Sequence, residues 1–307
     1  MKNSLSAKRK IRIREYGVWY AMIAIPLIGF LVFSLYPILW AVQKAWFFYD
    51  GSISTMRYVG FDNFVTLFTK DSTYWTAWLT TFKFAFLKIP FEMIIAMGLA
   101  LILHRKLPGS GFFRSIYYMP SVISVAIIGV VFANMFDFFG FINGILMKYN
   151  TISENINWFE KAGSSMFVLV TASVWNTFGI NVMYFLVALS NIDKELFEAA
   201  EIDGSSKART FFSITLPMMG PVLQTILLLS INGTLLTNDL ILVTTGGAPA
   251  GKTYSIAAYV TSKFVPGFAE GSVNIGYGAA CAIVMAVLMA AIAGIYSKIS
   301  KKLNNIY

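Results

Sequence analysis

The sequence of 307 residues is too apolar for an ordinary soluble domain, because 57% of its residues are hydrophobic and only 13% are charged, against about 45–50% and about 25% in soluble proteins. The net charge of +9 does not indicate nucleic-acid binding, since the Lys and Arg residues lie in short clusters between apolar runs. With one Cys and one His, the sequence also excludes a disulfide framework and a Cys/His metal cluster. We therefore expect an all-α membrane protein that carries no catalytic residues, no metal site and no cofactor site.

Six apolar segments are long enough to cross a bilayer as helices, which takes about 20 residues each. The first follows a basic stretch, but it is too long for the core of a signal peptide and ends without a small-residue cleavage site. We interpret it as a retained helix. The sequence thus predicts about six transmembrane helices, near residues 18–44, 76–103, 115–136, 165–190, 217–244 and 273–297.

Basic residues gather on one side of these predicted spans. Both chain ends and the loops 104–114 and 191–216 carry fifteen Lys and Arg residues, whereas the opposite side carries seven. Because short cytoplasmic loops collect Lys and Arg, we expect both termini in the cytoplasm. The expected organisation is a basic cytoplasmic segment 1–17, a transmembrane permease domain 18–297 and a basic cytoplasmic tail 298–307.

The loop 191–216, between the fourth and fifth spans, is the longest on the basic side and reads as two short helices. Asp193 is a candidate N-cap of the first helix, and Gly204 permits a sharp turn after it. Pro217 suits the first turn of the next membrane helix. The first helix would have an apolar side made of Leu196, Phe197, Ala200 and Ile202.

This loop contains the order Glu-Ala-Ala, three residues, Gly, nine residues, Ile, one residue, Leu-Pro. The residues that meet it are Glu198, Ala199, Ala200, Gly204, Ile214, Leu216 and Pro217. The pattern resembles the loop shared by integral-membrane subunits of binding-protein-dependent ABC importers. That resemblance implies a coupling helix that docks into a cleft of a cytoplasmic ATPase subunit. The residues assigned to this coupling loop are Glu198, Ala199, Ala200, Asp203 and Gly204.

Further segments resemble carbohydrate-uptake permeases of the first type, in particular the maltose-type subunit that pairs with a second, non-identical permease. They are Val59–Phe64, Tyr118–Pro120, Trp175–Asn176, Asp239–Ile241 and Thr245–Pro249. The resemblance implies a multi-pass protein of a bacterial or archaeal cell membrane that transports a sugar or oligosaccharide. It also implies three kinds of partner: a cytoplasmic ABC ATPase dimer that binds ATP and Mg²⁺, a second permease and an extracellular solute-binding protein.

Two short motifs are interpreted as chance matches. Gly246–Thr253 fits the phosphate-binding pattern G-x-x-x-x-G-K-[ST], but that motif needs a preceding strand, whereas here it follows a predicted membrane helix on the side away from the basic loops. Asn232-Gly233-Thr234 fits the glycosylation pattern but lies within the fifth predicted span.

Polar side chains within the spans are candidates for the transport pathway, because such groups are costly in lipid unless they are paired or face water. Asn232 and Asp239 are seven residues apart and would share a face of one helix. Carboxylates and amides suit the hydroxyl groups of a sugar. The alternative role is hydrogen bonding between packed helices. The pathway candidates are Asn176, Asn181, Asn232, Asn238 and Asp239.

Lys88 and Glu92 are spaced i, i+4 around Pro90 in the second span. This spacing favours an internal ion pair. A proton relay is the competing interpretation, since intramembrane acids also power secondary carriers. Two other functions remain open: a proton- or sodium-coupled carrier, or an ABC permease for a solute other than a sugar. A membrane scaffold or receptor would leave the intramembrane polar residues unexplained.

Overall fold

The computed structural model describes residues 2–105, 108–265 and 273–304, and places side chains within residues 16–302. The predicted segments 1–17 and 298–307, and the loop 104–114 with Lys106, therefore lie partly outside the described residues. The regular secondary structure of the described chain is helical, apart from one antiparallel pair of two-residue strands in which Phe47 lies opposite Tyr58.

The elements follow one another along the chain as α1 Lys2–Phe30, η1 Leu31–Leu35, α2 Tyr36–Lys44, β1 Phe47–Phe48, β2 Arg57–Tyr58, α3 Asp62–Thr69, α4 Ser72–His104, α5 Ser110–Val122, α6 Val125–Met135, α7 Phe141–Lys148, α8 Ala162–Ser190, α9 Lys194–Ile202, α10 Lys207–Thr210, η2 Phe211–Thr215, α11 Leu216–Met218, α12 Gly220–Leu235, α13 Asp239–Thr244, α14 Ile256–Phe264 and α15 Ile275–Asn304. The elements η1 and η2 are short π-helical turns within longer helices.

Four stretches within the described residues are long and apolar enough to cross a membrane as continuous helices. They are Tyr16–Lys44, Ser72–His104, Ala162–Ser190 and Ile275–Lys302. Two pairs of bent helices, in 110–135 and 207–235, raise the number to six if each pair is one span. This agrees with an all-α membrane protein of about six spans.

The third and fifth predicted spans are not single straight helices, and these predictions are corrected. Helices α5 and α6 meet at an angle of 93°, because the backbone is extended at Ile123 and Ser124. The fifth span bends by 70° at Met219. It breaks again at 236–238, so that α12 and α13 are separate helices.

The two long helices α4 and α8 pack together and carry the core of the bundle. Their N-terminal halves contribute residues such as Phe84 and Leu169 to one buried apolar cluster, which also contains side chains of α6, α13 and α14. Their C-terminal halves contribute Ala96, Ala100 and Phe185 to a second cluster that also contains Ile226 of α12. Between the two clusters, α4 and α8 carry the buried polar residues Lys88, Glu92, Asn176 and Asn181.

A hydrogen-bonded acid joins three helices at one end of the bundle. Asp71 caps α4, because its carboxylate accepts the backbone N–H of Tyr74 at 3.0 Å. The same carboxylate accepts hydrogen bonds from the hydroxyls of Tyr259 on α14 and Tyr277 on α15. Helices α4, α14 and α15 are therefore fixed to one another at this end.

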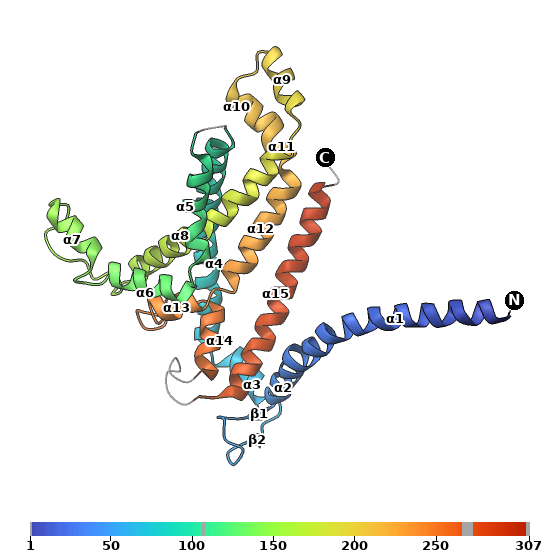
Figure 1. Cartoon of the computed structure of the whole chain (residues 1–307). Coiled ribbons are helices and arrows are strands. Elements are labelled where there is room, and N and C mark those ends of the chain that lie inside the picture. The colour runs from blue at the N-terminus through green and yellow to red at the C-terminus, as the bar shows by residue number, and fades with distance from the viewer. Residues whose placement is uncertain (1, 106–107, 266–272, 305–307) are drawn as a thin grey trace.

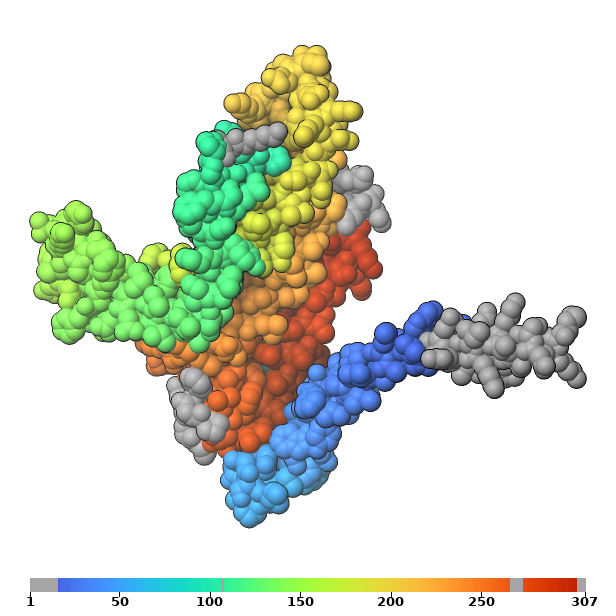
Figure 2. All heavy atoms as spheres, in the orientation of Figure 1, coloured from blue at the N-terminus to red at the C-terminus, as the bar shows by residue number. Residues whose placement is uncertain are grey.

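The bundle has two distinct ends, which Figure 1 shows. Helices α9 and α10 lie at one end and the β1–β2 hairpin lies at the other. Helix α1 leaves the bundle as a long arm, and α7 projects on the other side (Figures 1 and 2). None of the apolar window of Tyr16–Lys44 is buried within the chain.

Candidate functional site

Polar side chains meet at the middle of the two long helices. Lys88 lies sixteen residues from either end of α4, and Asn176 lies fourteen residues from either end of α8. At 1.5 Å per residue, these positions are about 24 Å and about 21 Å from the helix ends. If α4 and α8 cross a bilayer, both groups lie close to its midplane.

Lys88 and Glu92 form a buried ion pair within a small network. Lys88 Nζ lies 3.5 Å from Glu92 Oε2, and the two side chains are 5% and 1% exposed. The Lys88 ammonium group also donates to Thr234 Oγ1 on α12 at 3.2 Å. Asn181 Nδ2 on α8 donates to Glu92 Oε1 at 2.6 Å. The network thus joins α4, α8 and α12.

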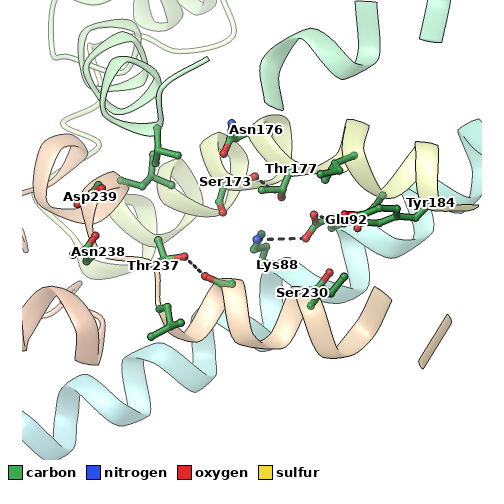
Figure 3. A pocket seen from close by; sticks show the side chains of 17 residues that line it. Lys88, Glu92, Ser173, Asn176, Thr177, Tyr184, Ser230, Thr237, Asn238 and Asp239 are labelled. Carbon is green, nitrogen blue, oxygen red and sulfur yellow. Dashed lines mark hydrogen bonds and ion pairs between the residues drawn. The ribbon is translucent and has the colours of Figure 1, made fainter. Parts of the chain in front are cut away.

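This network forms part of the wall of a cavity of about 390 Å³. Figure 3 shows the side chains of α4, α8 and α12–α13 around it, with Lys88 and Glu92 directed toward each other. The lining contains one cationic side chain, Lys88, and two acidic ones, Glu92 and Asp239. Since Lys88 pairs with Glu92, Asp239 leaves the lining with a formal charge of −1.

The cavity brings together most of the residues that the sequence singled out. Asn176, Asn181, Asn238 and Asp239 line it, as do Lys88 and Glu92. Asn232 does not line it. The expectation that Asn232 and Asp239 share one helical face is wrong, because the break at 236–238 separates their helices.

Asn176 also makes a structural contact beside the break in the third span. Its Nδ2 donates to the Pro120 carbonyl at 2.9 Å, near the end of α5. The same carbonyl accepts the Ile123 backbone N–H at 3.3 Å, so the Asn176 amide gives it a second hydrogen bond. Ser121 Oγ in turn donates to the Asn176 carbonyl at 2.8 Å. Asn176 therefore joins α5 to α8 as well as lining the cavity.

The break at 236–238 is stabilised in a similar way. Asn238 Nδ2 donates to Thr261 Oγ1 at 3.3 Å, and Ser255 Oγ donates to the Thr237 carbonyl. Both partners belong to the α14 region, which thus supports the irregular backbone beside the cavity. Asp239, the first residue of α13, is exposed.

Five further polar residues line the cavity and are not among the predicted pathway candidates. The hydroxyls of Thr177 and Thr237 donate to backbone carbonyls one turn earlier, Ser173 O and Gly233 O. Their oxygen lone pairs are left to face the cavity. Ser173, Thr177 and Tyr184 lie at helical spacing on one face of α8, so spacing was an available signal for these three. Ser230 and Thr237 come from α12 and the break, where it was not. The five residues are Ser173, Thr177, Tyr184, Ser230 and Thr237.

The predicted coupling segment folds as α9 at one end of the bundle (Figure 1). Its apolar side chains divide between two faces. Ala200 is buried, and Phe197 packs against the second core cluster. In contrast, Glu198, Ala199 and Ile202, which are three and four residues apart, are exposed on a shared face. Ile202 is 87% exposed.

Gly204 ends α9 in a left-handed conformation with φ of 69°. Asp203 precedes it, and Ser205 N–H donates back to the Ala200 carbonyl at 2.9 Å. Apart from its neighbours in the chain, a Cβ at Gly204 would meet no atom of the described residues within 4 Å. The glycine is therefore explained by its φ, which L side chains rarely adopt, and not by crowding within the chain.

The predicted cap of α9 is corrected. Asp193 occupies the N-cap position, but its side chain makes no capping hydrogen bond. Ser206 does cap the next helix, because its Oγ accepts the Arg209 backbone N–H at 3.3 Å.

Comparisons with known proteins agree on one family. Residues 92–305 match the family model described as "Binding-protein-dependent transport system inner membrane component". The chain is 31% identical over 302 residues to the trehalose/maltose transport system permease protein MalF of Thermococcus litoralis, covering 98% of this chain and 99% of that protein. It is 32% identical to the lactose transport system permease protein LacF of Rhizobium radiobacter, over 83% of this chain and 87% of that one.

Among solved structures, the chain resembles one from a bacterial ABC transporter involved in the import of the acidic polysaccharide alginate. The TM-score is 0.80 at 21% identity, and the match covers 95% of this chain and 97% of the other. At this identity the likeness establishes a shared fold.

Proposed function

The chain belongs to the family of binding-protein-dependent transport inner membrane components, and we propose that it forms half of the pathway for a carbohydrate in an ATP-driven importer. It is a multi-pass protein of the cell membrane and a transport subunit of an ABC importer. The observation that carries the carbohydrate assignment is the polar cavity at the middle of α4 and α8.

The chemistry of the cavity supports a neutral, hydroxyl-rich substrate. Its lining offers amide, hydroxyl and carboxylate groups that hydrogen-bond to hydroxyls, and the ring of Tyr184 offers an apolar face. The formal charge of −1 left by Asp239 disfavours an anionic substrate. The names of the relatives do not separate neutral from anionic substrates, since MalF and LacF are named for trehalose/maltose and lactose transport, whereas UgpA of Escherichia coli is named for sn-glycerol-3-phosphate transport.

The α9 face supports a mechanism driven from outside the chain. Glu198, Ala199 and Ile202 form an exposed face, while Phe197 and Ala200 anchor the helix to the bundle. Pressure on this face would pass to η2, α11 and α12, which follow in the chain and reach the cavity at Ser230. We propose that a cytoplasmic ATPase dimer, which binds ATP and Mg²⁺, docks on this face.

The proposed topology puts α9 and both termini in the cytoplasm and the β1–β2 hairpin outside, in keeping with the distribution of Lys and Arg. A second permease would complete the pathway, and the exposed apolar surface of Tyr16–Lys44 supports such a partner. An extracellular solute-binding protein would deliver the carbohydrate. One solved relative is a bacterial alginate ABC transporter in complex with a periplasmic protein bound to alginate pentasaccharide.

The test is uptake by the reconstituted transporter. The chain is placed in proteoliposomes with its co-encoded ATPase, sister permease and binding protein, and uptake of labelled maltose, trehalose and lactose is measured with and without ATP. We expect uptake of at least one sugar that requires ATP and the binding protein. Uptake without ATP that follows an imposed proton gradient would instead establish a secondary carrier, in which Lys88 and Glu92 relay protons.

Coupling is tested with variants of α9. Glu198→Ala and Gly204→Val are expected to lower both co-purification of the ATPase and ATP-driven uptake, while the chain still inserts. Asp193→Ala is the matched control, because it removes an exposed carboxylate beside the same helix, five residues from Glu198, whose side chain makes no capping hydrogen bond. Normal docking and uptake in Glu198→Ala and Gly204→Val would exclude this role for α9.

A further inference from the structure

A second cavity, of about 830 Å³, lies between α4 and α8 and differs in chemistry from the polar one. Its walls are mainly apolar and aromatic. From α4 they include Phe86, Leu87, Phe91 and Ile95, and from α8 they include Met166, Phe167, Val174, Trp175 and Phe178. Several of these side chains are well exposed within the chain, among them Phe86 at 79% and Phe91 at 61%. We call this surface the α4–α8 groove.

The groove has the length of a lipid chain. On α8 its lining runs from Ala162, the first residue of the helix, to Phe178, sixteen residues further and just beyond the middle of the helix. This separation corresponds to about 24 Å along the helix. One leaflet of a bilayer core is about 15 Å thick. On α4 the lining continues from Lys83 to Ile95, twelve residues or about 18 Å further, and this is the length available to an acyl chain beyond the lysines.

Two lysines, Lys83 and Lys252, line the groove, and its lining contains no acidic residue. Lys83 lies on α4, within a membrane span, and Lys252 lies in the loop between α13 and α14. Both side chains are exposed, and no ion pair to either is found in the described part of the chain. A cation at membrane depth is costly unless an anion or water compensates it.

The loop that carries Lys252 is held in place beside α4. Thr80 Oγ1 donates to the Lys252 carbonyl at 3.4 Å. Within the same loop, the buried Thr253 hydroxyl donates to the Ala248 carbonyl at 2.8 Å. This is the segment that matches the phosphate-binding sequence pattern, but it connects two helices and does not follow a strand.

We infer that the α4–α8 groove binds an anionic phospholipid, with an acyl chain along the apolar lining and the headgroup phosphate at Lys83 and Lys252. The charge of the two lysines and the apolar length below them match the two parts of such a molecule. A zwitterionic lipid fits the apolar part equally well but is attracted less strongly to the lysines. The inference requires that the chain crosses the membrane and is independent of what it transports.

Trp175 provides the probe, because it lines the groove. The full-length chain is placed in nanodiscs that contain brominated phosphatidylglycerol or brominated phosphatidylcholine, at the same mole fraction in unlabelled lipid. The chain has seven tryptophans, so the Trp175 signal is taken as the difference between the unmodified chain and Trp175→Phe. We expect stronger quenching of this signal by the brominated phosphatidylglycerol.

Lys83→Gln/Lys252→Gln should abolish the preference, since each lysine is expected to contribute about fivefold in favour of an anionic lipid. Lys148→Gln, which removes an exposed lysine of α7 outside the groove, should keep it. Equal quenching by the two lipids, or a preference that survives the double substitution, would overturn the inference.

The measurement is repeated on the transporter assembled with its sister permease. Retention of the preference is the expected result. Loss of quenching by both lipids on assembly would show that another subunit fills the groove, which would also overturn the inference.

Discussion

At the scale of single residues, the ion pair of Lys88 and Glu92 combines two roles that sequence reasoning kept apart. It is buried and hydrogen-bonded to Thr234 and Asn181, as a structural pair would be. It also lines the polar cavity. Each charge is compensated mainly by the other. Removal of one partner should therefore lower the free energy of unfolding more than neutralisation of both.

We predict that Lys88→Met lowers the free energy of unfolding by about 3 kcal/mol, because it leaves Glu92 buried without its cation. Lys88→Met/Glu92→Gln should recover part of that loss, since the introduced glutamine is neutral and its amide oxygen still accepts from Asn181. The measurement is the unfolding midpoint of the purified chain in detergent. Lys148→Met is the control, because it removes an exposed lysine that lines neither cavity. A double variant as unstable as Lys88→Met would contradict this account.

The sequence identified the residue types of the cavity better than their arrangement. Asn176, Asn181 and Asp239 were recognisable because amides and carboxylates are rare within apolar spans. Ser173 and Ser230 carried no such signal, since a serine within a membrane helix can satisfy its hydroxyl on the preceding turn. The prediction that Asn232 lies beside Asp239 was wrong because it required one continuous helix through both residues.

At the scale of elements, the hydropathy of the sequence predicted the positions of the membrane helices well, but it did not predict where those helices are interrupted. The predicted spans 76–103 and 165–190 correspond to α4 and α8, whose bounds are Ser72–His104 and Ala162–Ser190. An average over twenty apolar residues does not register a two- or three-residue break. A backbone group freed at such a break can be paired by a distant side chain, as the Thr237 carbonyl is by the Ser255 hydroxyl, and one sequence does not reveal those pairings.

Gly179 sets the closeness of α5 and α8. A Cβ at this position would lie 1.8 Å from the Tyr117 carbonyl oxygen. We predict that Gly179→Ala separates the two helices and lowers the free energy of unfolding by about 1–3 kcal/mol, the usual cost of overpacking.

The matched control for this prediction is Gly98→Ala in α4. Its added Cβ would meet nothing within 4 Å, and alanine favours a helix over glycine by about 1 kcal/mol. Thermal midpoints in the same detergent should therefore fall for Gly179→Ala and stay level or rise for Gly98→Ala. Equal midpoints for the two variants would mean that α5 and α8 do not pack as described.

At the scale of the whole molecule, the proposed orientation rests on charge, and it is open to direct measurement. Cys281 is the sole cysteine and is buried, so Cys281→Ala provides a background for single cysteines. In it, Ser54→Cys in the β1–β2 hairpin should react with a membrane-impermeant maleimide in intact cells. Lys207→Cys on α10 should react only after permeabilisation. The reverse pattern would invert the topology.

Helix α1 has a thermodynamic consequence for any experiment on the isolated protein. The span Tyr16–Lys44 buries none of its apolar window against the rest of the chain. The free energy of covering that surface is gained only when lipid, detergent or another subunit meets it. Any part of the stability that comes from subunit contacts on this helix will fall on dilution. Dissociation of such an assembly would precede unfolding of the bundle that carries the cavity.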